Sequence, residues 1–551
     1  MSQYPVLNNF PKNTFYIWDS TSGVMRPATS ADLAGGSTTT STKLKDDSDN
    51  NINNFNALPV RIKGPSSTAF GEVKSSSPRP QIQAYLNSLN DLRIWNQFTG
   101  QGDGRFFQGS GYGVLNIGPT LLAYSTLQTK QSVSYVPGEG VTSRFTAEFN
   151  DGVANSLQLV GPYHGEDGFG FGYNGTNFGI FHRHDRKLHI AKLTITGAAS
   201  TATTATITLN GTPNTINIGA QGDVKNDARQ IATGTSYTEN GFLTLDHRSF
   251  AIEDSVYFTR STHGPITGEF SYSLAAGNGG GDFTVFNSGE NGSTDWYYQT
   301  GWNIDKMDGS GISSNTLNPQ AINIYQITYG WLGAMPPIFY VAPSGDQELC
   351  PVHLINWTNT KSGVHIQDPR TPVTYAVASA GSTTEMNLKG GSCYASVDGQ
   401  NSKLGPKWAV DNEKTANTTE TSILAIENSR VDLSKNSFNR RRLIVEDIEL
   451  SNESSTKSAT IRLYKGDKTS LNGYIFNSNN NNSNLLYDVS GSSINLNAST
   501  EKIRTIPLGP SQSTAIKLSE ILQPTQILIA TTQTSSSTAP IICSFNGEED
   551  L

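Results

Sequence analysis

Three histidines lie close together in the segment FHRHDRKLH, residues 181–189. His182 and His184 are two positions apart, so both side chains lie on the same face if the segment is a β-strand. Two imidazoles on one face can bind zinc, which takes nitrogen and sulfur ligands. The sequence does not fix a third ligand, because Asp185 would lie on the opposite face and His189 is five residues beyond His184. We therefore expect a solvated or interface strand here, with no metal site and no cofactor. The alternative is a metal ion that the histidine pairs of three chains bind together on a threefold axis.

Carboxylates are the next candidates for chemistry. Hydrolysis of a glycosidic bond needs two carboxyl groups about 5 to 10 Å apart, one protonated and one ionised. Concanavalin-like glycosidases present such acids from one strand in an E-x-D-x-x-E or E-x-D-x-E spacing, and neither spacing occurs in the predicted sandwich strands. Glu166 and Asp167 are adjacent and would lie on opposite faces, while Asp305 and Asp308 border a glycine turn. We interpret these acids as turn and capping residues and expect no enzymatic activity.

Aromatic residues beside short polar residues are typical of carbohydrate-binding surfaces, because the rings stack on sugar faces and the polar groups bind hydroxyls. The segment WYYQTGW, residues 296–302, has this composition. We predict Trp296, Tyr298 and Trp302 as carbohydrate-binding residues. The alternative is that most of these rings fill the core of a β-sandwich.

The composition indicates a β protein that does not bind nucleic acid. Of the 551 residues, 16% are charged, and the runs of Ala, Glu, Lys and Leu that form long helices are scarce. A net charge of -8 opposes binding to phosphates. The basic run at residues 440–442 leads into a predicted strand, and we interpret it as a solvated or interface-facing turn. No stretch approaches the roughly 20 apolar residues that span a bilayer, so we expect no membrane insertion.

The three cysteines, Cys350, Cys393 and Cys543, are far apart, odd in number and without a CxxC motif. This pattern predicts free thiols in a protein that is assembled in a reducing cytoplasm. The N-terminal sequence shows no basic region followed by an apolar core, so we expect no signal peptide.

Residues 1–60 predict an anchoring arm and a polar linker. Phe15, Tyr16, Ile17 and Trp18 are consecutive apolar residues, and a low-complexity polar stretch that includes GGSTTTSTKLKDD follows them. The polar stretch cannot bury enough surface to offset its ordering entropy. Exposed apolar residues ahead of such a linker indicate a docking segment, so we predict that these four residues anchor the chain to a larger particle. A linker that docks nothing is the alternative.

Residues 61–191 and 292–410 predict one β-sandwich. The segment EDGFGFGYNGTNFGI, residues 166–180, predicts two strands that turn at Asn174 and Gly175, a type I′ hairpin signal. Alternate glycines in the first strand allow aromatic rings of a neighbouring strand to lie flat on its backbone.

Changes in the sequence pattern predict two further structural units. Residues 192–291 predict an inserted α/β subdomain, in which DVKNDARQIATG is the best helix candidate, with Asp227 near its start and Gly234 at its stop. Residues 411–551 predict a C-terminal β-sandwich, with strands at SILAIENS, SATIRLYKG and QILIATTQT. A polar linker, LGPKWAVDNEKTANTTET, would separate the two sandwiches.

Several segments resemble a pattern found in virion proteins of tailed phages and some large DNA viruses. They are QTKQSVSYVPG at 128–138, DGFGFGYNGTNFGI at 167–180, WNIDKMDGSG at 302–311, and TLNP with NIYQITYGWLG at 316–333. The phrase FYIWDSTSGVMRPATSADL at 15–33 resembles N-terminal segments of phage fibre-type proteins, which dock an appendage onto the particle. The resemblance implies a mainly β fold: a concanavalin-A-like or jelly-roll sandwich with a small inserted α/β unit and a C-terminal β-sandwich.

The resemblance also implies a function. We expect a virion structural protein of a tailed phage, in a tail, baseplate or neck fibre, that takes part in assembly and host-surface attachment. Its partners would be other virion proteins, two further copies of itself in a homotrimer, and a host cell-surface glycan; it would be assembled in the host cytoplasm and located in the virion. Two alternatives remain: a tailspike enzyme that degrades host surface polysaccharide, and a capsid head or vertex fibre.

Overall fold

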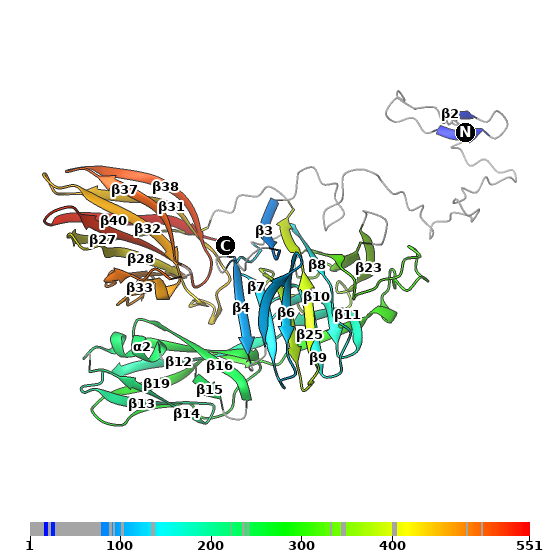
Figure 1. Cartoon of the computed structure of the whole chain (residues 1–551), viewed down its shortest axis with the longest axis horizontal. Coiled ribbons are helices and arrows are strands. Elements are labelled where there is room, and N and C mark those ends of the chain that lie inside the picture. Colours follow the sequence, from blue (N-terminus) through cyan, green and yellow to red (C-terminus); the bar gives the residue numbers. More distant parts are fainter. Residues whose placement is uncertain are drawn as a thin grey trace. The chain divides into compact units, whose positions relative to one another are not determined.

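The structure is a computed structural model of the 551-residue chain (Figure 1). It describes residues 16–19, 24–27, 79–87, 91, 94–100, 104–133, 138–220, 222–233, 237–239, 242–330, 333–342, 349–398, 405–480, 483–497 and 500–550. The chain divides into two compact units, Met1–Pro65 and Ser66–Leu551. In the first unit, β1 (Tyr16–Asp19) pairs antiparallel with β2 (Val24–Pro27). The elements below all belong to the second unit.

Two antiparallel sheets form a sandwich (Figure 1). The order of strands in the first sheet is β20 (Ser293–Tyr298), β11 (Asn177–His184), β10 (Gly168–Asn174), β9 (Ser156–Pro162), β24 (Val373–Ser379), β7 (Tyr124–Thr129) and β4 (Trp95–Gly100). The order in the second is β23 (Cys350–Leu354), β22 (Ile338–Val341), β21 (Asn323–Gly330), β8 (Gly140–Ala147), β26 (Ser392–Val397) and β3 (Arg79–Tyr85). A smaller sheet contains β25 (Met386–Gly390), β6 (Tyr112–Ile117) and β5 (Arg105–Gly109).

One apolar core lies between the two large sheets. Phe171 of β10 and Tyr325 of β21 meet there with ring centroids 4.7 Å apart. These residues come from the two sides of the predicted insertion, so strands that are distant in sequence build a single core.

The β10–β11 hairpin confirms the role predicted for alternate glycines. Gly170 lies opposite Phe181, and a Cβ on Gly170 would lie 2.4 Å from Cε1 of that ring. The turn, however, is displaced by one residue from the prediction. Asn174 pairs with Asn177, so Gly175 and Thr176 form the loop, and Gly175 has a φ of 60°. Glycine adopts this left-handed conformation without steric cost.

The chain between β11 and β20 forms a smaller body of two sheets and one helix. The strands of its first sheet are β15 (Tyr237–Glu239), β16 (Phe242–Ile252), β17 (Ser255–His263), β12 (Lys187–Gly197) and β19 (Gly280–Glu290). Those of its second sheet are β14 (Thr212–Ile218), β13 (Thr203–Leu209) and β18 (Ser271–Leu274).

The predicted helix of this body is present as α2 (Val224–Ala232). Its N-cap is Asp223, whose side chain accepts a hydrogen bond from the backbone of Lys225. Asp227 lies in the first turn of the helix, as predicted. It is buried and accepts a hydrogen bond from the N–H of Ala199 at 2.6 Å. Gly234 lies outside the described residues.

The C-terminal module also has two antiparallel sheets around a core of its own. The first contains β27 (Lys407–Ala416), β40 (Ala539–Glu549), β31 (Leu443–Asn452) and β38 (Ser513–Leu522). The second contains β34 (Asn477–Ser478), β35 (Leu485–Asp488), β28 (Thr421–Asn428), β39 (Ile527–Thr534), β32 (Ala459–Gly466) and β37 (Glu501–Leu508). Two short ladders join β29 (Val431–Asp432) to β30 (Ser437–Phe438) and β33 (Leu471–Asn472) to β36 (Ser493–Ile494).

The polar linker predicted between the sandwiches was wrong, because this segment forms β27. Trp408, Val410 and Ala416 are buried, while Asp411 and Glu413 between them are exposed. One face of the strand is therefore solvated, and its polar residues were mistaken for a linker. The second module begins at Lys407 rather than at the predicted residue 411.

Cys393 and Cys543 are buried free thiols, and Cys350 is half-buried. Among the described residues, no helix is long and apolar enough to span a membrane.

Candidate ligand-binding site

A cavity of about 400 Å³ lies among loops and strand ends of the second unit. We call it the charged cavity, because acidic and basic residues line it in equal number. The acidic residues are Glu166, Asp167, Glu290, Asp368 and Asp432, and the basic residues are Arg186, Lys187, Arg370, Lys435 and Arg440.

The loop that carries Glu166 and Asp167 is held by His164. Nδ1 of His164 accepts hydrogen bonds from the backbone N–H groups of both acidic residues, each at 3.2 Å. Burial lowers the pKa of His164 well below its ordinary value, so the ring is neutral and able to accept. Gly168 follows with a φ of 128°, and a Cβ there would lie 2.4 Å from Cα of Tyr163. The two acidic residues thus lie in a bend before β10 rather than in a strand, and both line the cavity instead of lying on opposite faces.

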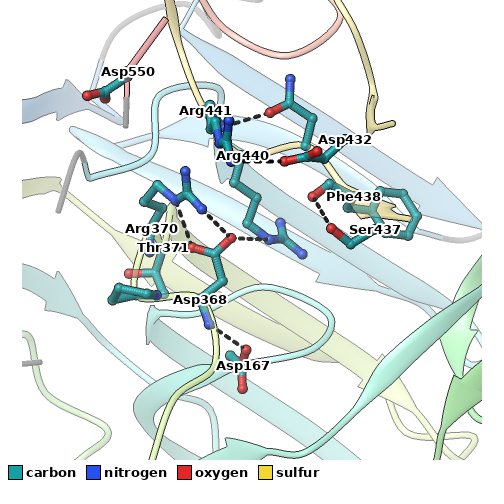
Figure 2. Close-up of polar contacts among 12 residues, drawn as sticks. Asp167, Asp368, Arg370, Thr371, Asp432, Ser437, Phe438, Arg440, Arg441 and Asp550 are labelled. Carbon is teal, nitrogen blue, oxygen red and sulfur yellow. Dashed lines mark hydrogen bonds and ion pairs between the residues drawn. The ribbon is translucent and has the colours of Figure 1, made fainter. Parts of the chain in front are cut away.

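Asp368 is the centre of an ion-pair network in the cavity wall (Figure 2). Arg370 donates from Nε to Oδ1 at 2.9 Å and from Nη2 to Oδ2 at 3.2 Å, which is a bidentate pair. Arg440 approaches Oδ2 of Asp368 at 3.8 Å and donates to Oε2 of Glu166 at 2.7 Å. Burial alone would raise the pKa of Asp368, but Arg370 and Arg440 outweigh it and lower that pKa to about 2.

Asp167 is a buried carboxyl group whose pKa is raised, whereas that of Asp368 is lowered. Burial raises the pKa of Asp167 to about 7, and hydrogen bonds from the backbone of Asp368 and Gln367 only partly oppose this shift. Its Oδ2 accepts from the N–H of Asp368 at 3.1 Å (Figure 2). Its Oδ1 is buried without a hydrogen-bond partner among the described residues. Two carboxyl groups in one cavity therefore differ in protonation near neutral pH.

The basic run at residues 440–442 is paired rather than free. Arg441 lies 3.5 Å from Asp432, and Arg442 lies 2.9 Å from Asp550. Nη1 of Arg442 also donates to Gln81 of β3 at 3.0 Å. The sequence allowed either a solvated turn or an interface-facing turn, and the structure has the second. The interface lies between the C-terminal module and the sandwich.

Two of the predicted carbohydrate-binding residues lie together at a sheet edge. Trp296 and Tyr298 are on β20, the edge strand of the first sheet, and their half-buried rings stack 6.1 Å apart at 13°. Trp302 is instead 3% exposed in the sandwich core, and its indole N–H donates to the carbonyl of Tyr297 at 3.0 Å. We therefore correct the prediction for Trp302, because neither face of this buried ring is open to a sugar.

The predicted anchoring residues are described only in part. Tyr16, Ile17 and Trp18 lie in β1 of the first unit, and Phe15 lies outside the described residues.

The histidine pair acquires a third residue that the sequence did not indicate. Asp295 of β20 lies opposite His182 in the β11–β20 ladder. Among the described residues, one potential ligand atom each of His182, His184 and Asp295 lie within 4.8 Å of one another. The third ligand was missed because it is 111 positions from His184.

No protein-family model matches the chain, and no curated protein sequence matches it. Solved structures that resemble it include the legume lectin-like domain from Entamoeba histolytica, at 9% identity and a TM-score of 0.21 over 58% of this chain and 98% of that one. Peanut lectin with a 9mer peptide resembles it at 10% identity and a TM-score of 0.22 over 58% and 99% of the two chains. The binding domain of botulinum neurotoxin DC in complex with SialylT resembles it at 9% identity and a TM-score of 0.24 over 84% and 98%.

None of these structures assigns a ligand to this chain. The chain is mainly β and contains antiparallel sandwich sheets, as the sequence predicts.

Proposed function

We propose that the protein is a structural component of a tailed-phage virion, in a tail, baseplate or neck fibre, and that its charged cavity binds a host-surface glycan. The virion assignment is supported by the sequence segments that resemble virion proteins, which lie in both halves of the sandwich. The binding assignment is supported by one observation above all. Three buried polar atoms in the lining or wall of the cavity have no hydrogen-bond partner among the described residues: Oδ1 of Asp167, Nη1 of Arg370 and Nε of Arg186.

Buried polar atoms without partners are unfavourable, so a ligand that supplies partners gains affinity from them. A sugar hydroxyl is both donor and acceptor and can therefore satisfy carboxyl and guanidinium groups alike. The equal number of acidic and basic residues favours such a neutral ligand over a polyphosphate or a polycation. Phe286 and Phe438 also line the cavity and offer apolar contacts for a sugar ring. Its volume of about 400 Å³ falls in the range of roughly 300 to 1,000 Å³ of ligand sites.

Calorimetric titration tests the binding assignment. The titrant is a set of oligosaccharide fragments released from the surface polysaccharide of the host bacterium. Lys435→Ala removes an exposed donor at the cavity, and Lys502→Ala is the matched control on the exposed face of β37. We expect the Kd to rise about tenfold in the first variant, equivalent to one charged hydrogen bond of about 1.4 kcal/mol, and to stay unchanged in the control. Absence of binding by the unaltered chain, or equal binding by both variants, contradicts the assignment.

The virion assignment has its own test. Particles purified on a density gradient should contain the chain when they are analysed by mass spectrometry, and antibodies to the C-terminal module should label one part of the particle in electron micrographs. Label on the tail, baseplate or neck supports the proposal, and label on the head supports the alternative of a head or vertex fibre. A chain that is present in the lysate but missing from particles contradicts both.

A second candidate is a hydrolase that acts on the same glycan. It is favoured by Asp167 and Asp368, whose pKa values of about 7 and about 2 are the acid and base pattern of a glycosidase. We prefer binding without turnover, because Arg370 occupies both oxygens of Asp368. Release of reducing ends by the purified chain, lost in both Asp167→Asn and Asp368→Asn, would establish the hydrolase instead.

A further inference from the structure

A cluster of nitrogen and oxygen ligands lies at the edge of the first sheet. His182 and His184 are on β11, and Asp295 is on the neighbouring strand β20. Nε2 of His184 lies 3.2 Å from Oδ2 of Asp295. Trp357 packs edge-on against both imidazoles, with ring centroids 5.3 Å and 5.6 Å away. The cluster is therefore partly enclosed by an apolar ring.

Hydrogen bonds determine which nitrogen of His182 is free. Its Nε2 lies 2.5 Å from the carbonyl oxygen of His365. A carbonyl only accepts, so Nε2 carries the proton and Nδ1 holds a lone pair. That Nδ1 belongs to a fully buried side chain and has no hydrogen-bond partner among the described residues. A buried lone pair without a donor is available to a cation.

The hydrogen bonds of His184 likewise determine which of its nitrogens carries a proton. Its Nδ1 lies 2.8 Å from Oδ2 of Asp185, a carboxylate that accepts, so Nδ1 carries a proton. In the neutral ring, Nε2 then has a lone pair that faces the carboxylate oxygen of Asp295. Two lone pairs at 3.2 Å repel each other unless a proton or a metal ion lies between the groups. A carboxylate that holds the outer nitrogen of a metal-binding histidine is a common feature of zinc sites.

We propose that His182, His184 and Asp295 bind one divalent transition-metal ion. Two imidazoles and one carboxylate match the ligand preference of Zn²⁺, and at bond lengths of about 2.0–2.1 Å tetrahedral ligands lie roughly 3.3 Å apart. The His184–Asp295 separation of 3.2 Å already has this value. Three protein ligands leave the fourth position of the tetrahedron to water or to a ligand group. The proposal is independent of glycan binding in the charged cavity.

The test measures metal content in the full-length chain with Cys350→Ser, because the half-buried Cys350 thiol could bind zinc by itself. The chain is stripped with EDTA, incubated with Zn²⁺, dialysed and analysed by mass spectrometry for zinc. We expect one ion per chain and a higher melting temperature than in EDTA. We expect zinc affinity to fall at least about tenfold in Asp295→Asn and in His184→Gln. Asp411→Asn, an exposed carboxylate of β27, is the matched control and should bind as the parent does.

Two outcomes of the zinc analysis overturn the proposal: no stoichiometric zinc in the parent chain, or equal zinc in the parent and both ligand variants. Asp295 is 39% exposed, so its substitution by Asn is compatible with folding. If a variant fails to fold, the visible spectrum of the Co²⁺-loaded parent shows whether the metal site exists. A four-coordinate Co²⁺ spectrum without a thiolate band supports the site. A six-coordinate spectrum, or none, shows that His184 instead pairs with the two aspartates as a protonated imidazolium.

Discussion

Arg440 donates a hydrogen bond to Glu166 at 2.7 Å, although 274 positions separate the two residues. Their side chains are 15% and 12% exposed. Glu166 belongs to the sandwich and Arg440 to the C-terminal module, so this ion pair joins the two in the wall of the charged cavity. This ion pair therefore affects both the free energy of unfolding and the shape of the charged cavity.

Removal of the arginine should destabilise the protein strongly. In Arg440→Met, Glu166 keeps its charge in a mostly buried place, and the loss of one partner of such a pair costs about 3 kcal/mol. The midpoint of denaturant unfolding should fall accordingly. Glu446→Gln, which removes one exposed partner of the exposed Lys407, is the control and should change the midpoint little. Equal midpoints for the two variants would show that the buried pair contributes nothing.

Asp167 should make stability depend on pH. Burial raises the pKa of Asp167 from 3.8 to about 7. Between these values the folded state binds more protons than the unfolded state, so this group lowers the free energy of unfolding as the pH rises. Asp167→Asn removes the titration. We expect the stability of the parent relative to this variant to decrease by up to a few kcal/mol between about pH 4 and about pH 7. Chemical denaturation across this range measures it, and a difference that is constant with pH contradicts the account.

Gly170 should tolerate no side chain. A Cβ there would lie 2.4 Å from Phe181 and 2.5 Å from the carbonyl oxygen of Val160. We expect Gly170→Ala to lower the free energy of unfolding by about 1–3 kcal/mol through overpacking. Gly109→Ala is the control, since a Cβ at Gly109 meets nothing within 4 Å. Similar thermal unfolding of both variants would mean that the hairpin adjusts easily.

The fold could be predicted largely from local pattern. Alternating apolar residues, the glycines of β10 and the helix at 224–232 are features of contiguous sequence, and each is found in the structure. The segment that forms β27 was predicted as a polar linker, and this error has a physical reason. An edge strand with one solvated face, such as the one that contains Asp411, has a composition close to that of a linker.

The candidate site was less predictable, because its residues come together only in the folded chain. Nothing in the sequence indicates that Glu166 and Arg440 form an ion pair. Asp368 and Arg370 were overlooked, although an Asp-Pro-Arg triplet in a chain with only 16% charged residues was a signal that could have drawn attention. The strand pairing that places Asp295 beside His184 likewise depends on a connection through the whole inserted body.

Assembly gives a further prediction, since a homotrimer buries the same patch three times. The purified chain should have the mass of three copies in light scattering at micromolar concentration, and a monomer would speak against self-driven assembly. Removal of residues 1–40 should leave the trimer intact but prevent its incorporation into particles. Normal incorporation of the truncated chain would place the anchor outside Phe15, Tyr16, Ile17 and Trp18.

The central claim is that the charged cavity, and not the aromatic edge of β20, holds the glycan. Hydrogen exchange of the full-length chain with and without a saturating host oligosaccharide tests it most directly, because the two sites are on different peptides. We expect slower exchange at residues 164–168, 366–371 and 432–440, with no change at 293–298. Protection confined to 293–298, around Trp296 and Tyr298, or no protection anywhere, would contradict it.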